Sequence, residues 1–211
     1  MRFLSALLGL CVLLAVNCQT AFALASTKEN AQSKIKLQQV DSLPDVVRQT
    51  LALHFGELSD YKNIDELARS FVVPKKYRRP AGLFVTLSHK GKTRACWGSL
   101  DSHYPNLMAA TVYTTEAALR KEYRFKQINS VEWQFLKPQV SVIRGVEPIT
   151  SIAGQNALAY GLMVRQGNKA AVVLPGEASD AYYQLMICKV KAGIPSKQRC
   201  QIYRIKADVF K

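Results

Sequence analysis

Two tight hairpins constrain the fold of this chain more than any other feature of its sequence. The first spans residues 83–100 and turns at Gly91, and the second spans residues 161–174 and turns at Gly167 and Asn168. Glycine and asparagine tolerate the positive φ angles that short hairpin turns require. Because the strands of a hairpin are antiparallel, we expect these segments to belong to a largely antiparallel sheet.

Helical and further strand patterns surround the hairpins. Apolar residues recur at helical spacing in several segments, and shorter alternating stretches predict additional strands. The predicted helices cover residues 42–55, 64–71, 105–121 and 179–192, and the additional strands cover residues 140–143 and 202–210. Hairpins mixed with helices are typical of an α+β fold, here a largely antiparallel sheet with flanking helices.

The last predicted helix has clear end signals. Ser179 is suited to cap its first turn, while Gly193 and Pro195 end it. Between these signals, apolar side chains recur at helical spacing. We expect the side of this helix that faces the core to carry Tyr182, Leu185, Met186 and Val190.

The N-terminal segment is typical of a secretory signal peptide. Arg2 precedes an uncharged apolar run over residues 3–16, and polar residues at 17–20 end this run before it reaches the ~20 residues that a membrane-spanning helix needs. Two overlapping Ala-x-Ala patterns at residues 21–25 are suited to signal peptidase. We therefore predict a signal peptide over residues 1–25, export to the periplasm or the extracellular space, and no membrane span after cleavage.

The intact mass of the exported protein should correspond to a chain that begins at Leu24 or Ser26. Cleavage after Ala23 or Ala25 satisfies the small-residue pattern equally well. Mass spectrometry of the protein recovered outside the cytoplasm measures this mass directly. A recovered chain that still carries Met1 would contradict the prediction.

Beyond the signal, residues 26–40 are polar and form a predicted tether, and residues 41–211 are long enough for one domain. The chain is strongly basic, with a formal net charge of +14. Such a charge attracts phosphates. Export argues against nucleic acid as the partner, and the sequence has no zinc-ligand spacing, Gly-rich phosphate loop or recognition-helix pattern. The remaining interpretations are an anionic envelope surface, a small anionic ligand, or solubility alone.

The first hairpin also contains a recognisable pair of motifs. Residues 82–87 are Gly-Leu-Phe-Val-Thr-Leu, and residues 94–100 are Arg-Ala-Cys-Trp-Gly-Ser-Leu. They resemble the FVTL strand and the Arg-Gly-Cys-Ile-Gly-Thr signature of the AMMECR-one domain family. The resemblance continues in order along the chain, at residues 124–125, 140–149, 161–175, 188–193 and 203–210. The signal peptide and four departures make the chain similar to a divergent, exported member: Ala95, Trp97, Ser99 and Gln139.

The resemblance implies two unequal α+β lobes in one domain, built around an antiparallel sheet. It implies no cofactor. In microbes, members of the family resemble parts of a system that also contains a Memo-like protein and a radical-SAM enzyme, so such proteins are candidate partners. The resemblance leaves the biochemical activity open.

Cys96 and Arg94 carry the most specific chemistry of the first hairpin. Thiolate chemistry needs a cysteine near positive charge, and Arg94 lies two residues from Cys96 on the same predicted strand face. His89 or His103 could serve as the base, although neither has the spacing of a known triad. The alternative is that Cys96 packs as a small apolar side chain. The first hypothesis is therefore a thiol-dependent or redox enzyme that uses Cys96.

The second hypothesis is a binding or accessory module for an anionic ligand or partner. An arginine beside a glycine that allows close backbone approach is suited to hold a carboxylate or a phosphate. The candidate ligand-binding residues are Arg94, Gly98, Ser99 and Arg124. Pairing of Arg94 with a buried acid is an equally good interpretation of that residue.

The remaining candidates are a disulfide and two carboxylate pairs. Cys188 and Cys200 flank the turn at Gly193, so a strand that folds back along the helix could bring them within bonding distance. Carboxylate pairs could come from Glu116 with Glu122, or from Glu132 with Glu147. The chain has three histidines and no clustered carboxylates or cysteine pair, so we predict no metal site.

Overall fold

The computed structural model describes residues 35–211. The predicted signal peptide, residues 1–25, and residues 26–34 of the predicted tether lie outside the described residues. The last residues of the predicted tether belong to the fold. Gln38 forms an isolated parallel bridge to the end of a helix, and the Val40 side chain is buried.

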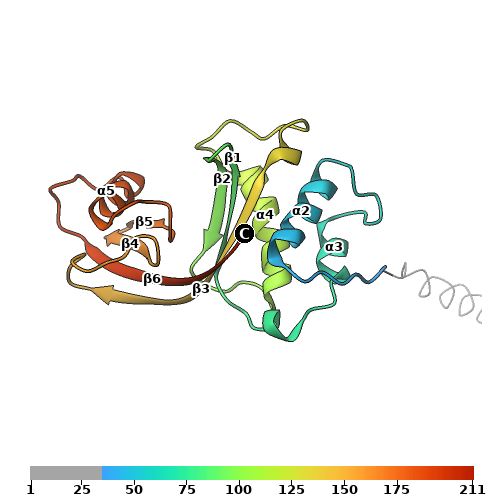
Figure 1. Cartoon of the computed structure of the whole chain (residues 1–211), viewed down its shortest axis with the longest axis horizontal. Helices are drawn as coiled ribbons and strands as arrows, with labels where there is room; N and C mark the ends of the chain where they lie inside the picture. The colour runs from blue at the N-terminus through green and yellow to red at the C-terminus, as the bar shows by residue number, and fades with distance from the viewer. Residues whose placement is uncertain (1–34) are drawn as a thin grey trace, which may run out of the picture. The chain divides into compact units, whose positions relative to one another are not determined.

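Within the described residues, the strands form one six-stranded antiparallel sheet in the order β2-β1-β3-β6-β4-β5 (Figure 1). The prediction of an α+β fold with a largely antiparallel sheet and flanking helices is confirmed. The strands are β1 (Leu83–His89), β2 (Lys92–Ser99), β3 (Lys137–Ile149), β4 (Gly161–Gln166), β5 (Lys169–Val173) and β6 (Gln201–Phe210).

The two long strands β3 and β6 hold the sheet together. They pair from Val140 with Phe210 to Ile149 with Ile202, so the strand predicted at residues 140–143 is only part of β3. The first hairpin pairs with one half of this two-stranded ribbon through β1, and the second hairpin pairs with the other half through β4. The ribbon therefore joins a larger lobe, which contains β1 and β2, to a smaller lobe, which contains β4 and β5 (Figure 1).

Three helices belong to the larger lobe, and their caps explain where they begin. Ser42 accepts a hydrogen bond at the start of α2 (Leu43–His54), Asn63 does so for α3 (Ile64–Ser70), and Asn106 for α4 (Leu107–Lys121). Helix α4 packs against β1 and β2, and α2 and α3 pack against α4. Within residues 35–211, no helix is both long and apolar enough to cross a membrane.

The smaller lobe contains α5 (Ala181–Ala192). Of the four side chains predicted to face the core, Leu185 packs against it, and the prediction is wrong for Tyr182, Met186 and Val190. Tyr182 and Val190 are 78% and 73% exposed, whereas Gln184 and Cys188 are fully buried. The buried amide of Gln184 donates a hydrogen bond to the carbonyl oxygen of Tyr160 at 2.9 Å. Because this contact satisfies a polar side chain inside the lobe, the helix is oriented by a hydrogen bond that its apolar pattern does not reveal.

Local turn and cap chemistry also differs in detail from the predictions. Asp180, not Ser179, caps α5 by accepting a hydrogen bond from the backbone N–H of Tyr183. In the second hairpin turn, only Gly167 has a positive φ angle, and Asn168 does not. In the first, both Lys90 and Gly91 have positive φ angles, which fits a two-residue turn.

Candidate functional site

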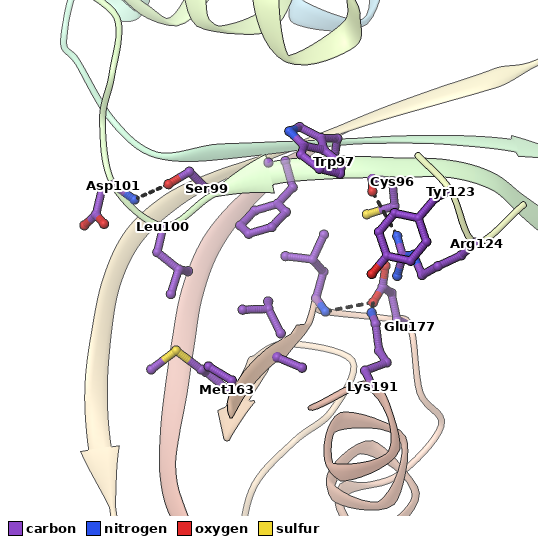
Figure 2. Close-up of a pocket in the computed structure, with 16 residues that line it drawn as sticks. Cys96, Trp97, Ser99, Leu100, Asp101, Tyr123, Arg124, Met163, Glu177 and Lys191 are labelled. Atoms are coloured by element: carbon purple, nitrogen blue, oxygen red, sulfur yellow. Dashed lines mark hydrogen bonds and ion pairs between the residues drawn. The ribbon is translucent and has the colours of Figure 1, made fainter. Parts of the chain in front are cut away.

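The two edge strands of the sheet, β2 and β5, line one cavity of about 540 Å³. The sheet curls, so that strands at its opposite ends face the same space (Figure 2). A second cavity of about 550 Å³ shares four residues with the first: Cys96, Arg124, Glu177 and Lys191. We call the space formed by these two cavities the interlobe cleft.

The walls of the interlobe cleft are apolar over much of their area. Phe84 and Trp97 come from the first hairpin, and Met163 and Leu174 come from the smaller lobe. The charged groups gather at one end, where Figure 2 shows Arg124 near Cys96, with Glu177 and Lys191 across from them. A ligand in this cleft therefore meets an apolar surface and a compact polar end.

Gly98 is required by the packing of the β2 wall. It lies opposite Phe84 in the register of β1 and β2. A Cβ atom at residue 98 would lie 2.4 Å from the carbonyl oxygen of Leu83 and 2.5 Å from Cγ of the Phe84 ring. The Phe84 ring therefore occupies the space that a side chain at residue 98 would need.

Cys96 lines the cleft, but its surroundings favour the neutral thiol. Its Sγ accepts a hydrogen bond from Thr86 Oγ1 at 3.3 Å. Burial raises the pKa of the Cys96 thiol, and the negative charge of Glu177 raises it further. A nucleophilic cysteine needs the opposite shift.

Glu122 and Arg124 form an ion pair that caps the edge of β2. The Glu122 side chain is only 3% exposed, and its Oε2 accepts a hydrogen bond from the backbone N–H of Cys96 at 3.2 Å. Arg124 Nη2 donates to the carbonyl oxygen of Cys96 at 3.0 Å. Burial alone would raise the pKa of Glu122, but hydrogen bonds from Arg124 and Cys96 outweigh it and hold that pKa below its ordinary value.

The cationic side chains of the cleft keep unused hydrogen-bond donors. Within residues 35–211, Nη1 of Arg124 and Nζ of Lys191 make no hydrogen bond, and Lys191 Nζ lies 3.7 Å from Glu177 Oε2. Glu122 accepts from Arg124 and Cys96, and Glu177 Oε2 accepts from the backbone N–H of Leu174 at 3.0 Å. Glu177 Oε1 accepts no hydrogen bond from the described residues. The unused donors of Arg124 Nη1 and Lys191 Nζ are suited to an anion.

Arg94 does not line the interlobe cleft. The register of β1 and β2 shifts between Leu87 and Ser88, and this irregularity breaks the alternation that would put Arg94 on the same face as Cys96. Arg94 Nη2 donates to Glu132 Oε2 at 3.0 Å and to the carbonyl oxygen of Lys126 at 3.0 Å. The sequence left two interpretations of Arg94, binding of an anionic ligand or pairing with an acid. The structure has Arg94 paired with an acid, Glu132.

Ser99 lines the cleft, whereas His89 and His103, the two candidate bases for Cys96, do not. Ser99 Oγ lies 3.1 Å from Nε2 of His103 and accepts a hydrogen bond from the backbone N–H of Asp101. His89 lies near Glu132 instead, with 3.8 Å between its Nδ1 and the carboxylate. The structure therefore brings no histidine into the cleft beside Cys96.

The structure does not form the predicted disulfide. Cys188 and Cys200 are both free thiols, although Cys200 packs against the apolar cluster that contains Cys188. Burial raises the pKa of the Cys188 thiol to about 11, and its Sγ donates to the carbonyl oxygen of Ala171 at 3.1 Å. A bridge between the two cysteines stays a prediction for oxidising conditions.

The carboxylates that could form pairs are held apart by different partners. Glu116 pairs with His54 and Arg120, Glu122 with Arg124, Glu132 with Arg94, and Glu147 with Arg204 and Lys206. In the part of the chain that the structure describes, no three histidine, cysteine or acidic side chains are arranged to hold a metal ion.

Three polar residues of the site were not singled out from the sequence. Glu177 and Lys191 lie on the smaller lobe and reach Cys96 only because the sheet curls. Glu122 was considered as half of a carboxylate pair, not as the partner of Arg124. Two signals were available. Lys191 lies in the segment 188–193 that resembles the family, and Glu122 and Arg124 are two residues apart, directly after the longest helix.

The fold and the site define a two-lobed α+β domain whose edge strands enclose a cleft. Comparison with protein families identifies the class. The AMMECR1 family model matches residues 44–211, nearly the whole described chain. The chain belongs to the AMMECR1 family, which confirms the resemblance found in the sequence.

Individual relatives agree with this assignment. A Thermotoga maritima protein is 33% identical over 145 residues, which cover 66% of this chain and 83% of that protein. A Methanothermobacter thermautotrophicus protein is 27% identical over 183 residues, 80% of this chain and 92% of that protein. The crystal structure of an uncharacterized Pyrococcus horikoshii protein has the same fold, with a TM-score of 0.64, 22% identity and coverage of 79% and 88% of the two chains.

Proposed function

We propose that this chain is an exported binding module that holds an anionic group, a carboxylate or a phosphate, in the interlobe cleft. The observation that supports the proposal is the unused donor capacity of Arg124 Nη1 and Lys191 Nζ at the polar end of the cleft. Charge-assisted hydrogen bonds from these two groups would converge on one ligand. Of the four ligand-binding residues predicted from the sequence, three line the cleft: Gly98, Ser99 and Arg124.

The charge of the whole chain supports the same proposal. A formal net charge of +14 attracts anions from solution before any specific contact forms. Within the cleft, Arg124 and Lys191 are accompanied by the acidic side chains Asp101 and Glu177. The local preference for an anion therefore rests on the unused donors of the two cations and not on the net charge of the cleft.

The alternative, a thiol-dependent or redox enzyme, has less support. Cys96 is in the right place, at the polar end of the cleft. Its raised pKa keeps the thiol protonated near neutral pH, and neither His89 nor His103 lines the cleft to act as its base. A binding role for the cleft needs no such base.

The partners and the location remain proposals. The anionic group could belong to a small ligand or to an envelope surface, and the family resemblance adds a Memo-like protein and a radical-SAM enzyme as candidate partners. Export rests on the signal sequence over residues 1–25, and the intact mass of the exported chain tests it.

Replacing Lys191 with glutamine should weaken binding of small anions about ten- to a hundredfold, because one charge-assisted contact is lost. Isothermal titration calorimetry with inorganic phosphate, citrate and N-acetyl-leucine measures the change. The substitution Lys191→Gln is preferred to a change at Arg124, since Arg124 also holds the edge of β2.

Matched variants separate the cleft from general charge. Lys197→Gln and Arg165→Gln each remove one exposed cation outside the cleft and should bind the same probes as the unmodified protein. Cys96→Ser should also keep binding. If none of the three anions binds, or if Lys197→Gln weakens them as much as Lys191→Gln, the proposal is wrong.

A further inference from the structure

We propose that the natural occupant of the interlobe cleft is the carboxyl-terminal end of an extended peptide, which pairs with the edge of β2 at Gly98. This inference rests on the proposed function, because it gives the anionic group a source: the terminal carboxylate. The argument comes from backbone groups rather than from side chains. Both strands that line the cleft end the sheet, so each has one side without a neighbouring strand.

The orientation of the β2 backbone follows from the contacts of Cys96. Its N–H and C=O bind the side chains of Glu122 and Arg124, so both groups point away from β1. In an antiparallel ladder this orientation repeats at every second residue. The N–H and C=O of Gly98 therefore also point away from β1, and within residues 35–211 no side chain or loop backbone bonds to them.

The position of Gly98 leaves this edge open to another backbone. The Phe84 ring packs where a side chain at residue 98 would lie, and residue 98 itself carries no side chain that could block an approaching strand. A neighbouring strand can then approach to the spacing of about 4.8 Å that strand pairing requires.

The Glu122–Arg124 pair determines where a peptide bound along β2 must end. These side chains occupy the hydrogen-bonding groups of Cys96, so pairing along β2 cannot continue past that residue. A peptide that runs antiparallel to β2, as every neighbouring pair in the sheet does, arrives at Cys96 with its carboxyl end. Its terminal carboxylate would then lie beside Arg124 Nη1 and Lys191 Nζ, which donate no hydrogen bond within the described residues.

The facing wall supplies a second row of backbone groups. The hairpin of β4 and β5 has a two-residue turn, closed by the pair Gln166 and Lys169. Hydrogen-bonded pairs alternate from that closing pair, so the backbone groups of Ala170 and Val172 point away from β4. Both residues line the cleft. A peptide between the two edges would thus meet backbone donors and acceptors on either side.

The apolar walls suit the side chains of such a peptide. Met163, Leu174 and Phe84 line the space between the two edges. A free phosphate would use the cationic end and leave these surfaces and both strand edges uncovered. An extended peptide with an apolar residue near its carboxyl terminus would contact the cationic end, the apolar surfaces and both strand edges.

The test uses a positional-scanning library of fluorescein-labelled pentapeptides with a free carboxyl terminus, measured by fluorescence anisotropy against the chain from Ser26 to Lys211. We expect a subset with apolar residues near the terminus to bind. The matching carboxyl-amide peptides should bind at least tenfold more weakly. N-methylation of the next-to-last residue should also weaken binding at least tenfold, because it removes a backbone donor.

Variants of the chain complete the test. Lys191→Gln should reduce the difference in affinity between the free-acid and the carboxyl-amide peptides, whereas Lys197→Gln should leave this difference unchanged. If phosphate and citrate bind but no peptide does, or if N-methylation has no effect, the peptide inference is overturned and the anion-binding proposal stands. If peptides bind equally well as amides and independently of Lys191, the anion-binding proposal is overturned with it.

Discussion

Replacing Gly98 with alanine should destabilise the domain by about 3 kcal/mol. The new Cβ would lie 2.4 Å from the carbonyl oxygen of Leu83 and 2.5 Å from two atoms of the Phe84 ring. Backbone cannot move away as a flexible side chain can, so the hairpin itself must distort. For a domain of this size the melting temperature should fall by about 6–12 °C, measured by differential scanning calorimetry.

Gly145 offers a matched control for this prediction. It also lies in a strand, β3, but a Cβ atom there would meet no atom within 4 Å. Gly145→Ala should therefore melt within about 2 °C of the unmodified protein, as surface substitutions commonly do. Equal melting temperatures for the two alanine variants would show that the Gly98 contacts do not constrain the fold.

Replacing Glu122 with glutamine should cost about 2 kcal/mol at neutral pH, the second-largest effect we expect. Removing one partner of a buried ion pair costs about 3–5 kcal/mol, but the Arg124 side chain is 37% exposed and water compensates part of the loss. Urea unfolding at pH 7 measures this difference. Glu57→Gln, at an exposed site, should change the free energy of unfolding by less than about 0.5 kcal/mol.

The pH dependence of the same variant gives an independent check. Because the folded protein holds the pKa of Glu122 below its ordinary value of 4.5, the carboxylate stabilises the fold above that value. This stabilisation is lost as the pH falls through the folded pKa. The difference in unfolding free energy between the unmodified protein and Glu122→Gln should therefore become smaller from pH 5 to pH 3, about the range where carboxylates titrate.

Other carboxylates still make the variant sensitive to acid. The hydrogen bond from Arg94 lowers the pKa of Glu132, so both proteins should lose stability in this pH range. The narrowing of the difference in unfolding free energy between the two proteins therefore identifies Glu122. The loss of stability that both proteins share does not. A difference that stays constant from pH 7 to pH 3 would contradict the assigned ion pair.

The fold could be predicted from the sequence wherever local chemistry determines it. The hairpin turns and the start of the helix predicted at residues 42–55 depend on residues within a few positions of each other, and the structure has them nearly as predicted. The orientation of α5 depends on a hydrogen bond from Gln184 to Tyr160, 24 residues away. No periodicity within the helix carries that information, so the prediction was wrong for three of the four residues of the core face and right for Leu185.

The site could be predicted only in part for the same reason. Cys96, Gly98 and Arg124 match the family motifs, Ser99 stands at a motif position where the family has threonine, and all four line the cleft. Arg94 does not, because an irregularity in the β1–β2 register disrupts the strand alternation on which its placement depended. The opposite wall, with Lys191, meets β2 only after the whole sheet has curled, and single-sequence patterns do not describe that curl.

The ribbon of β3 and β6 also determines how this domain must fold. Each lobe takes its central strands from the same two segments, and β6 is the last element of the chain. Neither lobe can complete its hydrogen-bond ladder until residues more than fifty positions apart have paired. Pairings between distant residues are slow to form, and they link the two lobes in one cooperative transition. Cutting the chain between the lobes would leave both fragments with open strand edges, so this domain is a single folding unit despite its two lobes.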